Sequence, residues 1–122
     1  MTTFYEDTAE NLLNRLANSH PSMRYEAALM LGREPSKWGT LESVTVIIES
    51  LAESLLHDTD RGVAIASAHS LAKIGKANGP MVAYLVEYLA VSIMESENTQ
   101  PFISTAARRI LECCHQAACT LH

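Results

Sequence analysis

Apolar side chains recur along most of the chain at steps of three and four residues, which is the spacing of one face of an α-helix. In the clearest run, five apolar residues share one face behind a Gly39-Thr40 cap: Leu41, Val44, Ile48, Leu51 and Leu55. Similar runs, separated by Gly and Pro, predict six helices at 5–18, 21–33, 40–57, 60–76, 80–96 and 100–119. The pattern therefore predicts an all-α protein in which short connections make neighbouring helices antiparallel hairpins.

The apolar pattern repeats with a period of 40 residues. Four sets of apolar or small residues align across three copies: Met23 with Val63 and Ile103, Ala27 with Ser67 and Ala107, Met30 with Ser70 and Ile110, and Leu31 with Leu71 and Leu111. The breakers repeat too, since Gly39 aligns with Gly79 and Pro21 with Pro101. This register predicts one domain over 1–122 with repeats at roughly 5–38, 39–78 and 79–122, and a common interior for Leu31, Leu71 and Leu111.

The segment from Met23 to Gly32, which reads MRYEAALMLG, resembles the second-helix signature of HEAT repeats, a family of paired-helix repeats. A second copy, from Asp60 to Gly75, keeps the leading Asp and the closing Ile-Gly. The third copy departs from the signature, with Ser104 in place of the Arg and Glu112 in place of the Gly. The resemblance covers nearly the whole chain and implies three antiparallel helical hairpins stacked as a short right-handed solenoid.

The resemblance also implies that the second helix of each repeat lines a concave binding surface. If residues 27 and 31 face the core, residues 25, 29 and 32 point outward at 100° per residue. Seven residues on this face and its border are the predicted partner-binding residues: Tyr25, Leu29, Arg33, Ile65, His69, Lys73 and Arg109. Gly32, Ala72, Thr105 and Glu112 complete the strip. Its composition fits an interaction surface, although the same residues could instead pack against loops or a second copy.

Two further apolar features each have two interpretations. Trp38, the single Trp, either plugs the core between the first two hairpins or is an exposed anchor for a partner. The fifth predicted helix is apolar on nearly all sides because of Tyr84, Tyr88 and Val91. It is therefore either buried between neighbouring helices or a surface for self-association.

The candidate chemistry is sparse. His115, Cys119 and His122 have helical spacing and zinc-compatible ligands, but no fourth ligand accompanies them, so no metal site is predicted. Cys113 and Cys114 suit small buried positions. Phosphate-binding glycine loops, nucleophile elbows and metalloprotease motifs are all missing, so the chain is not expected to be an enzyme or to carry a cofactor.

Composition narrows the classes of partner. The 122 residues are 48% hydrophobic and 19% charged with a net charge of −5, which disfavours nucleic-acid binding. No apolar stretch approaches the roughly 20 residues of a transmembrane helix, and the amino end lacks a secretory signal. Three cysteines crowded into the last ten residues fit a reducing compartment, so a cytoplasmic protein is expected.

These observations favour a protein-interaction module, a small scaffold or regulatory adaptor that binds a protein through its concave helix face. Two alternatives follow from other HEAT-like proteins. Bilin lyases resemble HEAT-like arrays and handle a phycobiliprotein pigment, and some DNA glycosylases are HEAT-like and recognise bases. Both alternatives rest on analogy of fold.

Overall fold

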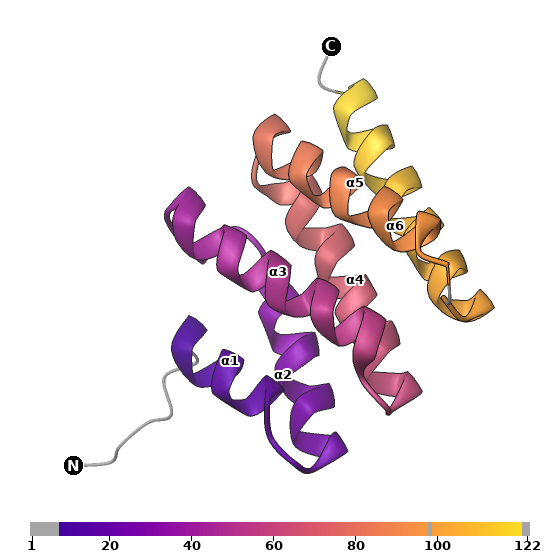
Figure 1. Ribbon diagram of the computed structural model, residues 1–122. Coiled ribbons are helices and arrows are strands. Elements are labelled where there is room, and N and C mark those ends of the chain that lie inside the picture. Colours follow the sequence, from indigo (N-terminus) through magenta and orange to yellow (C-terminus); the bar gives the residue numbers. More distant parts are fainter. Residues whose placement is uncertain (1–7, 98, 121–122) are drawn as a thin grey trace.

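The computed structural model describes residues 8–97 and 99–120, with side chains described up to residue 115. The described residues form six α-helices and no strand, which confirms the predicted all-α class (Figure 1). The helices are α1 (Ala9–Leu16), α2 (Pro21–Arg33), α3 (Leu41–His57), α4 (Arg61–Ala77), α5 (Pro80–Glu95) and α6 (Pro101–Thr120). Five of the six predicted ranges agree with these bounds to within one residue at each end.

Local capping chemistry sets most of these bounds. Thr8, Thr40 and Asp60 each accept a hydrogen bond from the backbone N–H three residues later, at 3.1, 3.2 and 3.1 Å. Pro21 and Pro80 occupy first helical positions, where the missing N–H is harmless. The predicted first helix, 5–18, is too long within the described residues, because Thr8 caps a helix that ends at Leu16.

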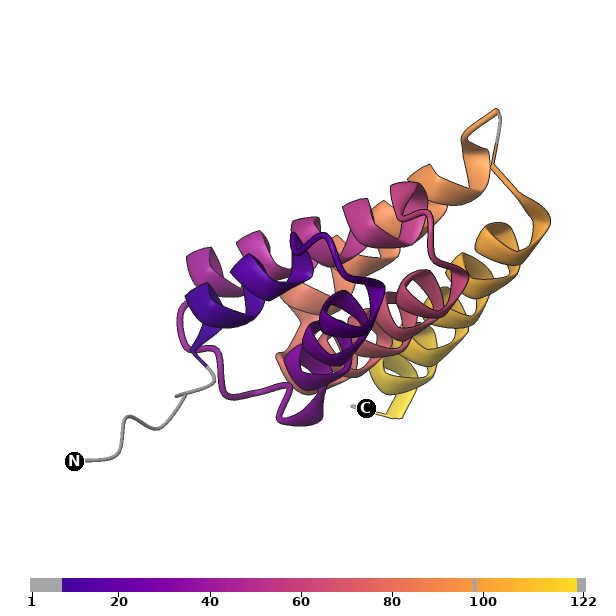
Figure 2. The same cartoon turned by 90° about the horizontal axis from the view of Figure 1, so that it is seen from below.

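The six helices form two layers (Figure 2). One layer contains α1, α3 and α5, and the other contains α2, α4 and α6. Four pairs pack across the layers, α1–α2, α3–α4, α4–α5 and α5–α6, while α4 contacts α2 and α6 within its own layer. Helix α4 therefore lies at the centre of the molecule, and it presents small residues such as Ala64, Ala66 and Ser67 to its neighbours.

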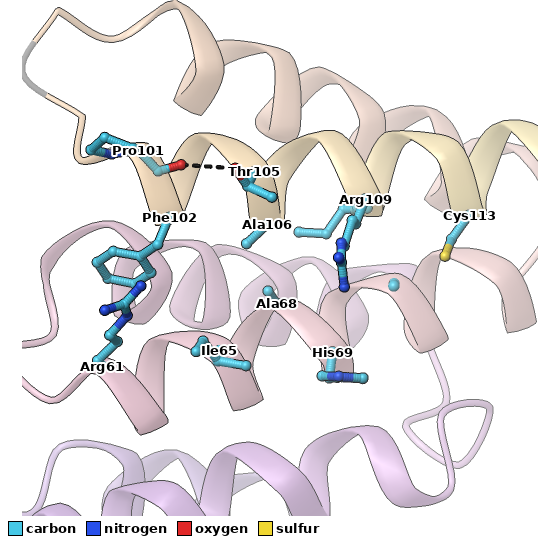
Figure 3. Close-up of a pocket in the computed structure, with 12 residues that line it drawn as sticks. Arg61, Ile65, Ala68, His69, Pro101, Phe102, Thr105, Ala106, Arg109 and Cys113 are labelled. Atoms are coloured by element: carbon cyan, nitrogen blue, oxygen red, sulfur yellow. Dashed lines mark hydrogen bonds between the residues drawn. The ribbon is translucent and has the colours of Figure 1, made fainter.

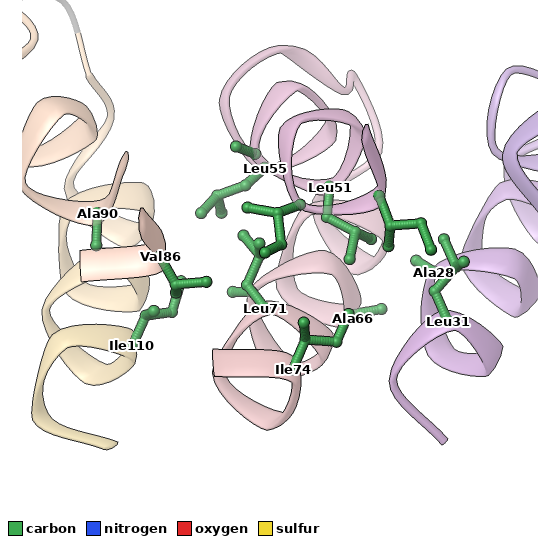
Figure 4. Packing of buried hydrophobic residues seen from close by; sticks show 14 of the residues in the cluster. Ala28, Leu31, Leu51, Leu55, Ala66, Leu71, Ile74, Val86, Ala90 and Ile110 are labelled. Atoms are coloured by element: carbon green, nitrogen blue, oxygen red, sulfur yellow. The ribbon is translucent and has the colours of Figure 1, made fainter. Parts of the chain in front are cut away.

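The apolar core runs between the layers, with Leu51 and Leu55 of α3 facing α4 and α5 (Figure 4). Leu31 and Leu71 are buried, as the repeat register predicts. Leu111 is only partly buried and packs against the edge of this core. The prediction that it shares the interior with Leu31 and Leu71 is therefore only partly correct. The reason is position: α2 and α4 are each followed within the layer by the next helix, α4 and α6, whereas among the described residues no helix follows α6.

Trp38 closes the core beyond the end of α2. Its side chain is 8% exposed, and its indole Nε1 donates a 2.8 Å hydrogen bond to the carbonyl oxygen of Leu31. The plug interpretation is therefore confirmed and the exposed-anchor interpretation is wrong. A buried indole with a satisfied N–H fixes the segment that leads to α3.

A charged clamp ties the first repeat to the second. Arg24 donates two hydrogen bonds to the carboxylate of Asp58, at 2.9 and 3.1 Å, and also donates to the carbonyl oxygens of Asn18 and Ser19. The bidentate hydrogen bonding with Asp58 raises the pKa of Arg24 above its ordinary value. Asp58 in turn accepts the N–H of Asp60 at 2.8 Å, so the clamp also orders the turn between α3 and α4.

Candidate functional site

The seven predicted partner-binding residues all lie exposed on the layer of α2, α4 and α6. The apolar members Tyr25, Leu29 and Ile65 are 45%, 41% and 44% exposed, which is unusual for large side chains near a core. The ring of Tyr25 lies 3.8 Å from where a side chain on Gly62 would begin. Tyr25 therefore extends from α2 across to α4, one turn before Ile65.

Gly32 does not belong to this exposed strip. It is buried against α4, where an added Cβ would lie 2.4 Å from Ser70 Oγ and 2.7 Å from Ser70 Cα. Ser70 Oγ donates a short hydrogen bond to the carbonyl oxygen of Ala28 at the same crossing. The prediction that residue 32 points outward is wrong, because the two backbones meet there.

Helices α4 and α6 separate to leave a groove with a volume of about 650 Å³ (Figure 3). Twelve residues line it: Arg61, Ile65, Ala68, His69, Ala72, Pro101, Phe102, Thr105, Ala106, Arg109, Ile110 and Cys113. Of the seven predicted residues, the structure brings Ile65, His69 and Arg109 together here. Tyr25, Leu29, Arg33 and Lys73 lie outside the groove, and Arg33 lines a separate hollow of about 140 Å³.

Two contacts pin the helices together at the ends of the groove. At the amino ends, the Arg61 guanidinium stacks 4.4 Å from the centroid of the Phe102 ring. Toward the carboxyl ends, Gly75 lets α6 approach, since a Cβ there would lie 2.6 Å from Cys114 Sγ. Between these contacts small side chains such as Ala68 and Ala106 form the floor, so the space between the helices stays open.

Sequence reasoning missed Arg61 and Phe102. Arg61 stands one helical turn before Ile65, so extending the outward face by one turn would have included it. No pattern in the sequence places Phe102 against Arg61, because that contact depends on how α6 crosses α4.

The charged residues of the groove are all of one sign. Arg61 and Arg109 are cationic, and no carboxylate is among the described residues that line the groove. In Figure 3 the Arg109 side chain extends from α6 toward α4. The groove is therefore a basic, mostly apolar site on a chain whose net charge is −5.

The part of the chain that the structure describes offers neither a metal site nor, at Cys114, a reactive thiol. No group of three or more His, Cys, Asp or Glu residues is arranged to hold a metal ion there. His115 is exposed, and the side chains of Cys119 and His122, the other members of the predicted triplet, lie outside the described residues. Cys114 is buried, and burial raises the pKa of its thiol to about 11, so it stays protonated at neutral pH.

The described helices include none that is both long and apolar enough to cross a bilayer. Comparison of the chain with protein-family models, curated proteins and solved structures finds no match. The resemblance to HEAT repeats therefore depends on the residues alone.

Proposed function

We propose that the chain is a protein-interaction module, a small scaffold or adaptor that binds a helix of another protein in the groove between α4 and α6. The observation that carries the proposal is the groove itself. It combines exposed apolar surface with basic side chains, on the face that the repeat register selects. Apolar grooves between helices commonly bind amphipathic helices through residues spaced three and four apart.

The proposed architecture is a HEAT-like solenoid of three antiparallel hairpins stacked with a right-handed twist. Alternation of the helices between two layers and the position of α4 between α2 and α6 support it. In such an array the second helices α2, α4 and α6 form the concave surface. Tyr25 and Leu29 then extend the binding surface beyond the groove.

The shape and charge of the groove define its occupant. From Arg61 to Ala72 the lining of α4 spans 11 steps, or about 16 Å at 1.5 Å per residue, which is three turns of a bound helix. Arg61 and Arg109, with no lining carboxylate to neutralise them, favour Asp and Glu beside the apolar positions of the partner. The proposed ligand is therefore an acidic amphipathic helix.

Selection from a phage-displayed peptide library with the purified chain tests this function. We expect enrichment of peptides with apolar residues at helical spacing and flanking acids. Arg109→Glu should lower the binding affinity for the best peptide about tenfold or more, because it reverses a charge that lines the groove. Thr105→Trp should also weaken binding by filling the groove.

Arg108→Glu is the matched control for Arg109→Glu, because Arg108 is the exposed neighbour on α6 and does not line the groove. It should leave peptide binding nearly unchanged. Equal binding by wild type, Arg109→Glu and Thr105→Trp would refute the proposed site, and failure to enrich any helical peptide would refute the proposed ligand.

Binding of a phycobiliprotein pigment is the second candidate, favoured by the size of the groove. A volume of about 650 Å³ lies within the range of small-molecule sites, about 300–1,000 Å³. This candidate predicts that biliverdin added to the purified chain changes its visible absorbance, and that Thr105→Trp abolishes the change. Recognition of DNA bases stays a prediction without a supporting observation.

A further inference from the structure

A stripe of exposed apolar side chains runs along the outer face of α5. Met81, Tyr84, Tyr88 and Val91 are 72%, 75%, 65% and 38% exposed. Their spacing of three, four and three places them on one line, opposite the buried Val86. Figure 2 shows α5 in the other layer from α4 and α6, so the stripe and the groove belong to different layers of the molecule.

The neighbouring helix shows what an ordinary solvent face in this layer contains. On α3 the exposed side carries Glu42, Glu49 and Glu53 beside the exposed apolar residues Leu41 and Val46. The stripe on α5 contains no charged residue between positions 81 and 91, apart from the half-buried Glu87 on its flank. The expectation that α5 is buried between neighbouring helices is therefore wrong for this face, and the self-association interpretation gains a defined surface.

We infer that this stripe pairs with the same stripe of a second copy, antiparallel and about a twofold axis that crosses the stripe midway between Tyr84 and Tyr88. A spacing of three, four and three reads the same in both directions, which is what a self-complementary twofold interface requires. In this register Met81 faces Val91 of a second copy, and Tyr84 faces Tyr88 of a second copy. These are the apolar layers of a short antiparallel coiled coil.

Charge at the ends of the stripe is compatible with the same register. Glu95 is exposed at the carboxyl end of α5. Antiparallel pairing brings it beside the amino end of α5 in the second copy, where free backbone N–H groups and the positive end of the helix dipole favour a carboxylate. Exposed Lys76 lies just before that end in the chain. Parallel pairing would instead bring the two Glu95 side chains together.

The apolar area of the stripe limits how much surface two copies can bury against each other. A Tyr side chain buries about 150–250 Å², so the exposed parts of Tyr84 and Tyr88 amount to roughly 300 Å² per copy and about 600 Å² in a pair. Met81 and Val91 bring the total toward roughly 1,000 Å², which is the low end for a specific interface. The structure thus points to a weak dimer that forms with increasing concentration.

Sedimentation equilibrium between about 1 and 500 μM of the intact chain measures this dimer. Wild type should change from monomer to dimer over this range. Tyr84→Glu and, independently, Met81→Lys should weaken dimerisation about tenfold or more. Both residues are mostly exposed, so both variants should keep the wild-type helical content and unfolding midpoint.

Ile65→Glu is the matched control, because Ile65 is a similarly exposed apolar residue on the opposite layer. It should leave the dimer unchanged. A dimer lost in Ile65→Glu but retained in Tyr84→Glu would overturn the inference and assign self-association to the groove face. A wild-type chain that is monomeric at 500 μM would overturn it outright.

Cross-linking tests the register. In a Cys113→Ser, Cys119→Ser background, a mixture of Tyr84→Cys and Tyr88→Cys chains should form a disulfide-linked dimer under mild oxidation. Each variant alone should cross-link far less, because positions 84 and 84 of two copies lie four residues apart along the paired helices. Equal cross-linking by Tyr84→Cys alone would overturn the antiparallel register. None of these outcomes depends on the proposed peptide binding.

Discussion

Helix α4 makes two contacts within its layer, and they differ in kind. Against α2 the backbones approach closely, because Gly32 and the Ala28 carbonyl meet only the short side chain and backbone of Ser70. Helix α6 also packs against α4, but a surface groove of about 650 Å³ runs along this contact. One side of α4 is a close helix crossing, and the other borders a groove.

The difference lies in the side chains that the neighbours present. Helix α2 offers a Gly and an Ala to α4, so it can approach closely and gain dispersion contacts. Helix α6 offers the larger side chains of Phe102, Arg109 and Ile110, which line the groove. Positions 40 residues apart can therefore form a close helix crossing in one place and line an open groove in another.

The largest expected effect comes from filling the close crossing of α2 and α4. Gly32→Val would place carbon atoms inside the volume of Ser70, including its backbone, and should destabilise the fold by about 3 kcal/mol. Ala72→Val, one repeat later and facing the groove, should change stability by less than about 1 kcal/mol. Urea unfolding followed by circular dichroism measures both. Similar losses in the two variants would mean that the two contacts are not different.

A smaller effect is expected at the pinned end of the groove. The Arg61 and Phe102 side chains should couple by about 0.5–1 kcal/mol, since the stacked pair is partly exposed. A double-mutant cycle with Arg61→Ala, Phe102→Ala and the double variant isolates this energy. Additive losses in the cycle would show that the stacking does not hold α6 to α4.

The smallest effect at neutral pH concerns Cys114, at the other end of the groove. Burial, with lesser contributions from Glu87 and Cys113, raises the pKa of its thiol from 9.0 to about 11. The folded-state pKa thus exceeds the unfolded value. The contribution of the protonated thiol to stability is complete below pH 9 and is lost as the pH rises through 11.

Unfolding of wild type and Cys114→Ala from pH 7 to 11.5 provides the measurement. Wild type should lose stability relative to the variant above pH 9, while other titrating groups cancel in the difference. Parallel curves would contradict a buried thiol at this contact.

The helices could be predicted from the sequence because their signals are local. Pro21 and Pro80 fix helix starts through their own backbone chemistry, and Thr40 and Asp60 cap helices within three residues of themselves. The exposure of Ile65, His69 and Arg109 followed from periodicity in the same way.

The predictions that were wrong concern positions whose environment depends on contacts between distant parts of the chain. The prediction for Gly32 is wrong because the periodicity of α2 alone carries no information about where α4 crosses it. The prediction for Leu111 is wrong in extent of burial because the repeat assumes that a further helix follows each second helix, and among the described residues none follows α6. The groove could not be predicted without knowing how α6 crosses α4, because its Arg61–Phe102 contact joins residues that are 41 apart in the chain.

The central position of α4 has a consequence for synthesis of the protein. Helix α2 finds its main partner in a helix that ends 44 residues later, at Ala77. At about 5–20 residues per second, a translating ribosome needs roughly two to nine seconds to supply it. During that interval the apolar sides of α2 and α3 have no α4 to cover them, so the nascent chain is most vulnerable to misassembly just before its middle helix emerges.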